Sequence, residues 1–400
     1  MSGVKEGSLA AASKAIFALA VGTFAIGTGE FAAMGLLPQM AQGVQATIPR
    51  TGEAISAYAM GVVVGAPLIA VFGATLSRRT LLAVLMGWFA VTNCLGTLAA
   101  TLGMLDLARF VTGLPHGAFM GVAALVAAGL VDRGYRGRAV GRVFSGLTIA
   151  NVVGAPFATY AGSYFGWRLS YVLIGLVGAL CCLMVMAWVP YDPPNKARSA
   201  LSELQAFTRK QVWYVMGTVA VGCGGMFCVY TYFSVTLQEG TGVPVWGVPL
   251  FQAVWGVGMC TGAWAGGHLM DKSLKWTAIG AFVWNALALG LFSLVATHMW
   301  LTALAVFMLG GGIAVGPAMQ VRLMDVAADA QTLAASMNHA AFNLANALGA
   351  WLGGLVLAAG FGSAATGWAG MVLSVIGLVL FVLSLAAERR DNHRAAALAG

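Results

Sequence analysis

The sequence predicts an all-α polytopic membrane protein with twelve transmembrane helices, arranged as two pseudo-symmetric six-helix bundles. Of the 400 residues, 60% are hydrophobic and only 8% are charged, whereas soluble proteins average about 25% charged residues. A membrane-spanning helix uses about 20 residues, so the apolar content is enough for about twelve spans. Irregular or open-edged backbone cannot face lipid, so the spans are expected to be helical. A soluble enzyme, a disordered chain and a secreted disulfide scaffold are excluded.

The individual spans follow from apolar runs that end at charged or turn-rich breaks. They lie at about 15–38, 54–76, 81–101, 104–130, 139–165, 169–189, 212–237, 249–270, 276–296, 300–321, 332–359 and 367–387. The first run is too long, and too polar at its far end, for a cleaved signal peptide. Connections are short except for the polar stretch 191–210. We therefore expect an N-terminal six-helix bundle at 1–190, a cytoplasmic central loop at 191–210 and a C-terminal six-helix bundle at 211–400.

The basic residues predict the orientation of the spans. With the N-terminus inside, 18 of the 21 lysines and arginines fall in inner tails and loops, which leaves Arg50 and Arg168 outside and Arg109 within a span. This bias follows the positive-inside rule and predicts two cytoplasmic termini. The net charge of +8 is therefore a topology signal, since scattered loop charges form no continuous patch for nucleic acid. The six cysteines lie in apolar runs without a CxxC pair, which is typical of small core residues.

Small residues recur at every fourth position along four spans, two in each half. Residues 148–155 also resemble residues 343–350, at an offset of 195. A spacing of four places small side chains on one stripe, where helix backbones can approach closely. The glycines concerned are Gly61 and Gly65 in the second span, Gly146, Gly154 and Gly162 in the fifth, Gly258, Gly262 and Gly266 in the eighth, and Gly349 and Gly353 in the eleventh. A single stripe is common in membrane helices, but four repeat-related stripes predict an interface along which two halves rock.

Five motifs together resemble the sugar-efflux, arabinose-exporter-like branch of the drug/proton antiporter-1 type within the major facilitator superfamily. They are GTGEFAAMGLLP at 27–38, RFVTGLPHGAF at 109–119, GLTIANVVGAP at 146–156 followed by GWR at 166–168, YTYFS at 230–234 and NLANALG at 343–349. The third motif ends at Pro156 and is similar to the branch's antiporter motif. The resemblance implies the major facilitator fold, a bacterial cytoplasmic (inner) membrane location, and export of sugars, nucleosides or small drugs driven by the proton gradient.

The loops at 73–79 and 267–273 match at an offset of 194, and they depart from the superfamily pattern in one respect. Relatives usually carry an acid in the first of these loops, but Ser77 stands at that position here. The second loop keeps Asp271, followed by Lys272. The inner-gate role that the resemblance implies is therefore expected at Asp271 and Lys272, and not at Ser77.

Glu30 is the one acid that lies well inside an apolar run, and Arg109 is the one base within a span. Counted at 1.5 Å per residue, both lie roughly 22 Å from the inner face. Asp106, Arg109 and His116 line one face of the fourth span, and we expect Asp106 to be an interfacial partner of Arg109. Desolvation favours a neutral carboxyl and a nearby cation favours a charged one, so these four residues are our proton-coupling candidates. The alternative is a fixed ion pair between Glu30 and Arg109 that locks two helices.

Uncharged polar and aromatic residues are the candidates for binding a substrate. They are Met34, Thr148, Asn151, Tyr230, Tyr232, Trp255, Asn338, His339, Asn343 and Asn346. Asparagines in membrane helices often serve instead to bond helices together, and tyrosines near a span's end often form the interfacial belt. With no second deep carboxylate and no basic cluster in these spans, a neutral or amphipathic small molecule fits best.

The sequence contains no nucleotide-binding, metal-binding or catalytic motif, so we expect no enzyme activity, no metal and no cofactor besides the proton gradient. The function predicted is secondary active transport, as proton-coupled antiport that exports a small molecule by alternating access. The alternative is a uniporter or importer in which the Glu30–Arg109 pair is structural. A receptor or scaffold is less favoured, because it would need a soluble output domain. The expected partners are the substrate and the lipid bilayer, with no nucleic acid and a monomeric state.

Overall fold

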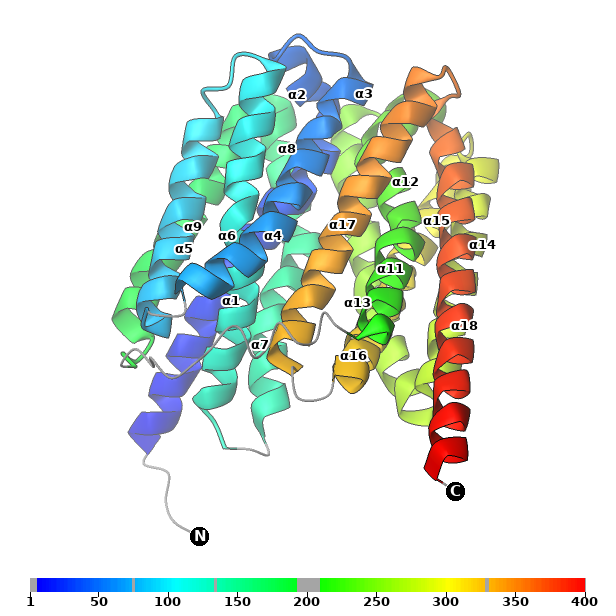
Figure 1. The fold of residues 1–400 in the computed structure, drawn as a ribbon. Coiled ribbons are helices and arrows are strands. Elements are labelled where there is room, and N and C mark those ends of the chain that lie inside the picture. Colours follow the sequence, from blue (N-terminus) through cyan, green and yellow to red (C-terminus); the bar gives the residue numbers. More distant parts are fainter. Residues whose placement is uncertain (1–5, 74–75, 133–134, 193–208, 328–330, 400) are drawn as a thin grey trace.

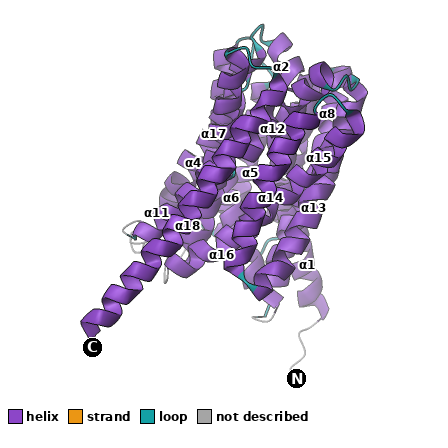
Figure 2. Cartoon of the chain, turned by 90° about the vertical axis from the view of Figure 1, so that its right-hand side faces the viewer, coloured by secondary structure: helices purple, strands orange, loops and turns teal. Residues whose placement is uncertain are grey.

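The computed structural model describes residues 6–73, 76–132, 135–192, 209–327 and 331–399. Within these ranges the chain is helical and contains no strand. The helices lie side by side in one bundle, and both termini lie at the same end of it (Figures 1 and 2). We call this the terminal end, and we call the opposite end, where α2 (Leu37–Gly43) and α3 (Ile48–Thr51) lie, the distal end. The predicted all-α class is confirmed.

The described helices group into twelve long segments. The first six are α1 (Glu6–Gly35), α4 (Glu53–Phe72), α5 (Arg78–Gly96), α6 (Leu102–Gly129), α7 with α8 (Arg136–Ile149 and Ala155–Phe165) and α9 (Trp167–Trp188). The second six are α11 with α12 (Lys210–Gly222 and Gly224–Val235), α13 (Val248–Lys272), α14 (Leu274–Val295), α15 with α16 (Met299–Gly311 and Val315–Ala327), α17 (Gln331–Ala358) and α18 (Thr366–Ala399). Most of the predicted central loop, residues 193–208, lies outside the described residues.

Eleven helical stretches among the described residues are long and apolar enough to cross a membrane. The segment outside this set is α13, whose 25 residues include Gln252, two tryptophans and several glycines that lower its mean hydropathy. It nevertheless packs along α15 and α8 as a segment of the bundle. One face of α13 is buried at Trp255, Gly258 and Gly262, while Leu250 and Trp264 are exposed on another.

Helix pairing repeats between the two halves of the chain. In the first half, α1 packs on α7 and α8, α4 packs on α6, and α5 packs on α9. In the second half, α12 packs on α17, α13 packs on α15, and α14 packs on α18. The same three pairings therefore recur in the same order, which is the structural counterpart of the weak sequence repeat.

The glycine stripes lie inside the halves, so the prediction that they form the seam between the halves is wrong. A Cβ on Gly61 or Gly65 would lie 2.1 Å from a backbone carbonyl of α6, and one on Gly258 or Gly262 would lie 2.2 Å from a carbonyl of α15. The remaining glycines of the stripes also face neighbours in their own half of the chain. Gly146 and Gly154 meet α1, Gly162 meets Leu36 and Ser170, Gly266 meets Ala314, and Gly349 and Gly353 meet α12. Spacing identifies a stripe that needs a close neighbour, but it does not identify the neighbour.

Contacts between the halves run mainly along two seams, α4 with α17 and α8 with α13, and α1 also contacts α12. Toward the distal end hydrogen bonds join the halves. In the first seam the Ser56 hydroxyl donates to the Ala347 carbonyl at 3.0 Å, and the Tyr232 hydroxyl of α12 lies 3.5 Å from the Pro49 carbonyl of α3. The second seam includes one close backbone approach, where a Cβ on Gly256 would lie 2.6 Å from the Asn151 carbonyl. The halves are thus joined largely through side-chain contacts, whereas within each half the helix backbones approach one another closely at the glycines.

Asn151 lies in a π-helical turn, Ala150–Gly154, that joins α7 to α8. Pro156 follows at the start of α8. Because proline has no backbone N–H, it cannot continue the regular hydrogen-bond ladder there, and π-turns accommodate such a defect within a helix. The antiporter-like motif therefore marks a local irregularity at the α8–α13 seam.

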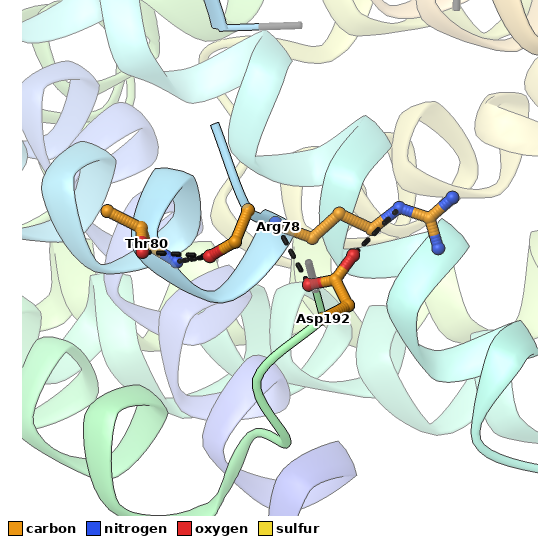
Figure 3. A network of polar contacts seen from close by, with 4 residues as sticks. Arg78, Thr80 and Asp192 are labelled. Atoms are coloured by element: carbon orange, nitrogen blue, oxygen red, sulfur yellow. Dashed lines mark hydrogen bonds and ion pairs between the residues drawn. The ribbon is translucent and has the colours of Figure 1, made fainter. Parts of the chain in front are cut away.

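At the terminal end, Ser77 caps α5, and its hydroxyl oxygen accepts from the Thr80 backbone N–H at 3.1 Å. Asp192 accepts from the Arg78 backbone N–H at 3.1 Å (Figure 3). Ser273 caps α14 in the same way, so the structural counterpart of Ser77 is Ser273. Asp271 and Lys272 lie exposed at the end of α13.

Candidate functional site

Glu30 lies on α1 in the middle of the protein and is buried. Its carboxylate accepts a hydrogen bond of 3.1 Å from the side-chain amide nitrogen of Asn346 on α17. Asn346 is completely buried. This bond joins the first half of the chain to the second, across 316 positions of sequence.

Arg109 on α6 is buried beside the same turn of α1. One guanidinium nitrogen donates to the Gly29 carbonyl at 3.2 Å. The guanidinium carbon lies 4.2 Å from the ring centre of Tyr58 and 5.4 Å from that of Tyr171. Among the described residues, its Nε and second terminal nitrogen have no hydrogen-bond partner. Arg109 is thus held by one carbonyl and two aromatic faces, a stabilising arrangement for a buried cation.

Glu30 and Arg109 come together as their matching depths predict, yet they form no ion pair. The ion pairs among the described residues are Arg78–Asp192 and Arg322–Glu388. Glu30 uses Asn346 as its partner, and Arg109 bonds the backbone one residue before Glu30. The fixed ion pair of the alternative interpretation is therefore not formed in this structure.

His116 lies two turns further along α6 and is also buried. Its Nδ1 is 3.1 Å from the Tyr58 hydroxyl, so Tyr58 contacts Arg109 through its ring and His116 through its oxygen. The intervening Gly113 lies against α4, since a Cβ there would lie 2.1 Å from the Tyr58 backbone carbonyl. Gly113 therefore makes room for α4, and not for the side chains of Arg109 and His116.

Asp106 is not a partner of Arg109, which corrects the prediction. Its side chain lines an open pocket of about 530 Å³ at the distal end, together with Arg50 and Gln45. One turn of helix separates Asp106 from Arg109 in sequence, but Arg109 extends toward α1 and α4. Asp106 thus faces a different region from the other three proton-coupling candidates.

Two of the aromatic candidates, Tyr230 and Trp255, form a buried stack of the second half that contacts α1 of the first. Tyr230 on α12 and Trp255 on α13 stack with ring centres 4.1 Å apart, and Phe31 on α1 lies 5.8 Å from Tyr230. Met34 is buried nearby, and its backbone carbonyl accepts from the Ser234 hydroxyl at 2.9 Å. Tyr232 points to α17, where its hydroxyl donates to the Ala350 carbonyl at 2.9 Å.

The asparagine candidates share one property: each has a buried amide oxygen that finds no hydrogen-bond partner in the described part of the chain. The residues are Asn151, Asn338, Asn343 and Asn346. For Asn151 and Asn343 the amide nitrogen bonds a carbonyl of its own helix, four residues back. Because a buried acceptor without a partner costs free energy, this set is suited to a ligand that brings hydrogen-bond donors.

Two further candidates lie elsewhere. His339 on α17 stacks on Phe144 of α7 with ring centres 5.7 Å apart, so it contacts the first half nearer the terminal end. Thr148 is exposed. The structure therefore brings Asn346 to Glu30, and brings the Tyr230–Trp255 stack to the neighbouring Phe31. Tyr232 and Thr148 have other surroundings.

Three residues of the site were missed from the sequence. Gln252 on α13 is fully buried, and its amide nitrogen donates to the Phe31 carbonyl at 3.3 Å across the two halves. Its isolated polarity within an apolar run was a usable signal. Tyr58 and Tyr171 gave no such signal, because tyrosine is common at the ends of membrane spans.

Tyr58 offers a test of how Arg109 is stabilised. Tyr58→Phe removes the hydroxyl near His116 and keeps the ring, so we expect the free energy of unfolding to fall by about 1 kcal/mol. Tyr58→Leu also removes the ring from a buried cation, and we expect about 2 kcal/mol more. Thermal unfolding of the purified variants in one detergent measures the difference. Equal losses in the two variants would contradict the contribution of the aromatic face.

Comparison with known proteins agrees with this architecture. The profile of the Major Facilitator Superfamily matches residues 19–328. Over 371 residues the chain is 38% identical to the inner membrane transport protein YdhP of Escherichia coli K12, covering 92% of this chain and 95% of that protein. Over 350 residues it is 33% identical to the putative transporter AraJ of the same strain, covering 87% and 89%.

Among solved structures, a mutant form of the nucleoside transporter NupG superposes with a TM-score of 0.72 at 13% identity, over 92% of this chain and 99% of that one. At this identity the likeness concerns the fold alone. The motifs read from the sequence, the repeated helix pairing and the match to the family profile agree with one another. The chain belongs to the major facilitator superfamily of membrane transporters.

Proposed function

We propose that the protein is a proton-coupled antiporter of the bacterial inner membrane, which exports a neutral, hydroxyl-bearing small molecule by alternating access. Its termini face the cytoplasm, as the distribution of basic residues predicts. The observation that carries the proposal is the buried Glu30 carboxylate, which is bonded to the other half of the protein and is not paired with Arg109. A carboxylate in that position can exchange a proton and can also report the exchange to the opposite half.

The packing supports alternating access as the mode of movement. Within each half, the glycine stripes let neighbouring helix backbones pack in direct contact, which favours movement of the halves as two rigid bodies. The seams between the halves rest largely on side-chain hydrogen bonds, such as Ser56 to Ala347 and Ser234 to Met34. Such bonds can be exchanged as the halves rock, whereas interdigitated backbones cannot.

The substrate class follows from the chemistry of the central residues. Unpartnered amide oxygens call for hydroxyl or amino donors. The stacked faces of Tyr230 and Trp255 favour a ring-shaped, partly apolar molecule. Sugars, nucleosides and hydroxyl-bearing amphipathic drugs share these properties.

The test is transport by the purified protein in liposomes, with L-arabinose, uridine and chloramphenicol as probes. For antiport, vesicles with an acidic lumen should accumulate a probe as protons leave, and an added protonophore should stop the accumulation. Accumulation with an alkaline lumen instead would indicate symport. Equilibration without any response to the pH gradient would indicate a uniporter.

A further inference from the structure

We propose that the side-chain amide of Asn346 makes proton and substrate mutually exclusive, because its oxygen is free for a substrate hydroxyl while its nitrogen donates to the Glu30 carboxylate. The inference rests on the proposed antiport and deepens it by naming a positioning residue for the exchange. Asn346 belongs to the second half and Glu30 to the first. The same residue would therefore report the protonation state of one half to a ligand held by the other.

The amide nitrogen and the amide oxygen of the Asn346 side chain have different surroundings. Its nitrogen donates to a Glu30 carboxylate oxygen at 3.1 Å. Its oxygen is buried and has no hydrogen-bond partner within the described ranges. One helical turn before it, the Asn343 oxygen is also buried and unpartnered, and residues three apart lie on the same face of a helix. Two acceptors thus stand side by side on α17, and one belongs to an amide that already bonds Glu30.

With Glu30 ionised, a substrate hydroxyl that donates to the Asn346 oxygen extends a series of hydrogen bonds that ends on the negative charge of Glu30. Hydrogen bonds to a charged group are stronger than neutral ones, and successive bonds in a chain polarise one another. Substrate binding is therefore favoured by the ionised form of Glu30. By linkage, substrate in turn favours the release of the proton.

With Glu30 protonated, the carboxyl keeps an acceptor oxygen and gains an O–H donor. When the amide turns over, its oxygen, which otherwise has no partner among the described residues, accepts from that O–H. The oxygen is then occupied, the negative charge is gone, and a substrate hydroxyl at this position meets an N–H group. The substrate is held less tightly, as exchange of proton for substrate requires.

Other titratable or charged groups also surround Glu30 and Asn346. They are Arg109 and His116 on α6, Tyr58 on α4, Tyr171 on α9, Tyr230 on α12 and His339 on α17, while the basic side chains of α7 and the end of α13 at Asp271 and Lys272 lie toward the terminal end. In the described structure none of these groups forms a hydrogen bond with the Glu30 side chain, whereas Asn346 does. The two histidines can add a pH dependence of their own, so Glu30→Gln must serve as the reference.

The experiment measures the Kd of the three probes for the purified protein in acidic and in alkaline buffer. We expect wild-type binding to weaken in acid, and we expect Asn346→Ala and Asn346→Leu to show only the residual pH dependence of Glu30→Gln. Ser56→Ala is the matched control, because it removes a neighbouring bond between the halves at Ala347 without touching Glu30. It should retain the wild-type ratio of the two Kd values.

The outcomes distinguish the proposed role of Asn346 between Glu30 and the substrate, which we call the relay, from antiport itself. A wild-type Kd that depends on pH, with the same dependence in both Asn346 variants, overturns the relay and leaves antiport standing. A wild-type Kd that does not depend on pH overturns both, and failure of all three probes to bind overturns the hydroxyl-donor site. For Asn346 variants that bind no probe, the Kd of Glu30→Gln decides, because its side chain is neutral at every pH. A Glu30→Gln variant that binds a probe as tightly as the wild-type protein does in alkaline buffer contradicts the relay.

Discussion

Glu30→Gln is expected to abolish substrate accumulation driven by a pH gradient, down to the level of protein-free vesicles. Glutamine keeps the size of the side chain and can still accept from Asn346 through its amide oxygen, but it cannot carry a proton. The pH gradient then has no site on which to act. Exchange of labelled for unlabelled substrate across the vesicle membrane, with no gradient, should continue because it needs no net proton movement.

The control for this prediction is Asp106→Asn, which removes a carboxylate of the same half that lines the distal pocket with Arg50. Since Asp106 does not contact Arg109, the variant should still respond to the pH gradient. Accumulation by Glu30→Gln at the wild-type rate would show that another group carries the proton.

Gly61→Ala is expected to cost stability far out of proportion to the single methyl group that it adds. The new Cβ would lie 2.1 Å from the Phe110 carbonyl on α6, and that neighbour is backbone and cannot turn away. Overpacking of this kind costs about 1–3 kcal/mol, and the separation of two helices along their length adds to that cost. A lower thermal unfolding midpoint and a lower yield of folded protein in detergent would report it.

Gly141→Ala is the matched variant, because Gly141 lies within α7 and a Cβ there has no neighbour within 4 Å. It should be neutral or slightly stabilising, since alanine favours helix more than glycine does. The equivalent pair in the second half, Gly258 against the Phe307 carbonyl, should respond like Gly61. A tolerated Gly61→Ala would contradict the α4–α6 packing.

The sequence contained enough information to predict the fold class and the depth of the charged residues. Spans follow from hydropathy alone, because lipid leaves so few solutions for the backbone. Counting residues along α1 and α6 predicted the meeting of Glu30 and Arg109, which the bond from Arg109 to the Gly29 carbonyl reflects. Both inferences need only the rise per residue and the thickness of the membrane.

The partners of individual residues could not be predicted in this way. Asn346 bonds Glu30 from the other half, and only the packing of α17 against the first half decides that. The partner helices of the glycine stripes could not be predicted for the same reason. Gly61 allows the close approach of α6, and it would allow the close approach of α17 equally well. The cation–π contacts of Arg109 with Tyr58 and Tyr171 depend on three helices converging, and no local pattern records that.

The release of protons on substrate binding tests the coupling through Glu30 most directly. Purified protein in weakly buffered detergent solution receives a saturating amount of a probe that it binds, and a pH indicator records the protons set free. Antiport through Glu30 predicts that wild-type protein releases protons and that Glu30→Gln binds the probe and releases none. Binding by the wild-type protein without proton release, or equal release by Glu30→Gln, would contradict it.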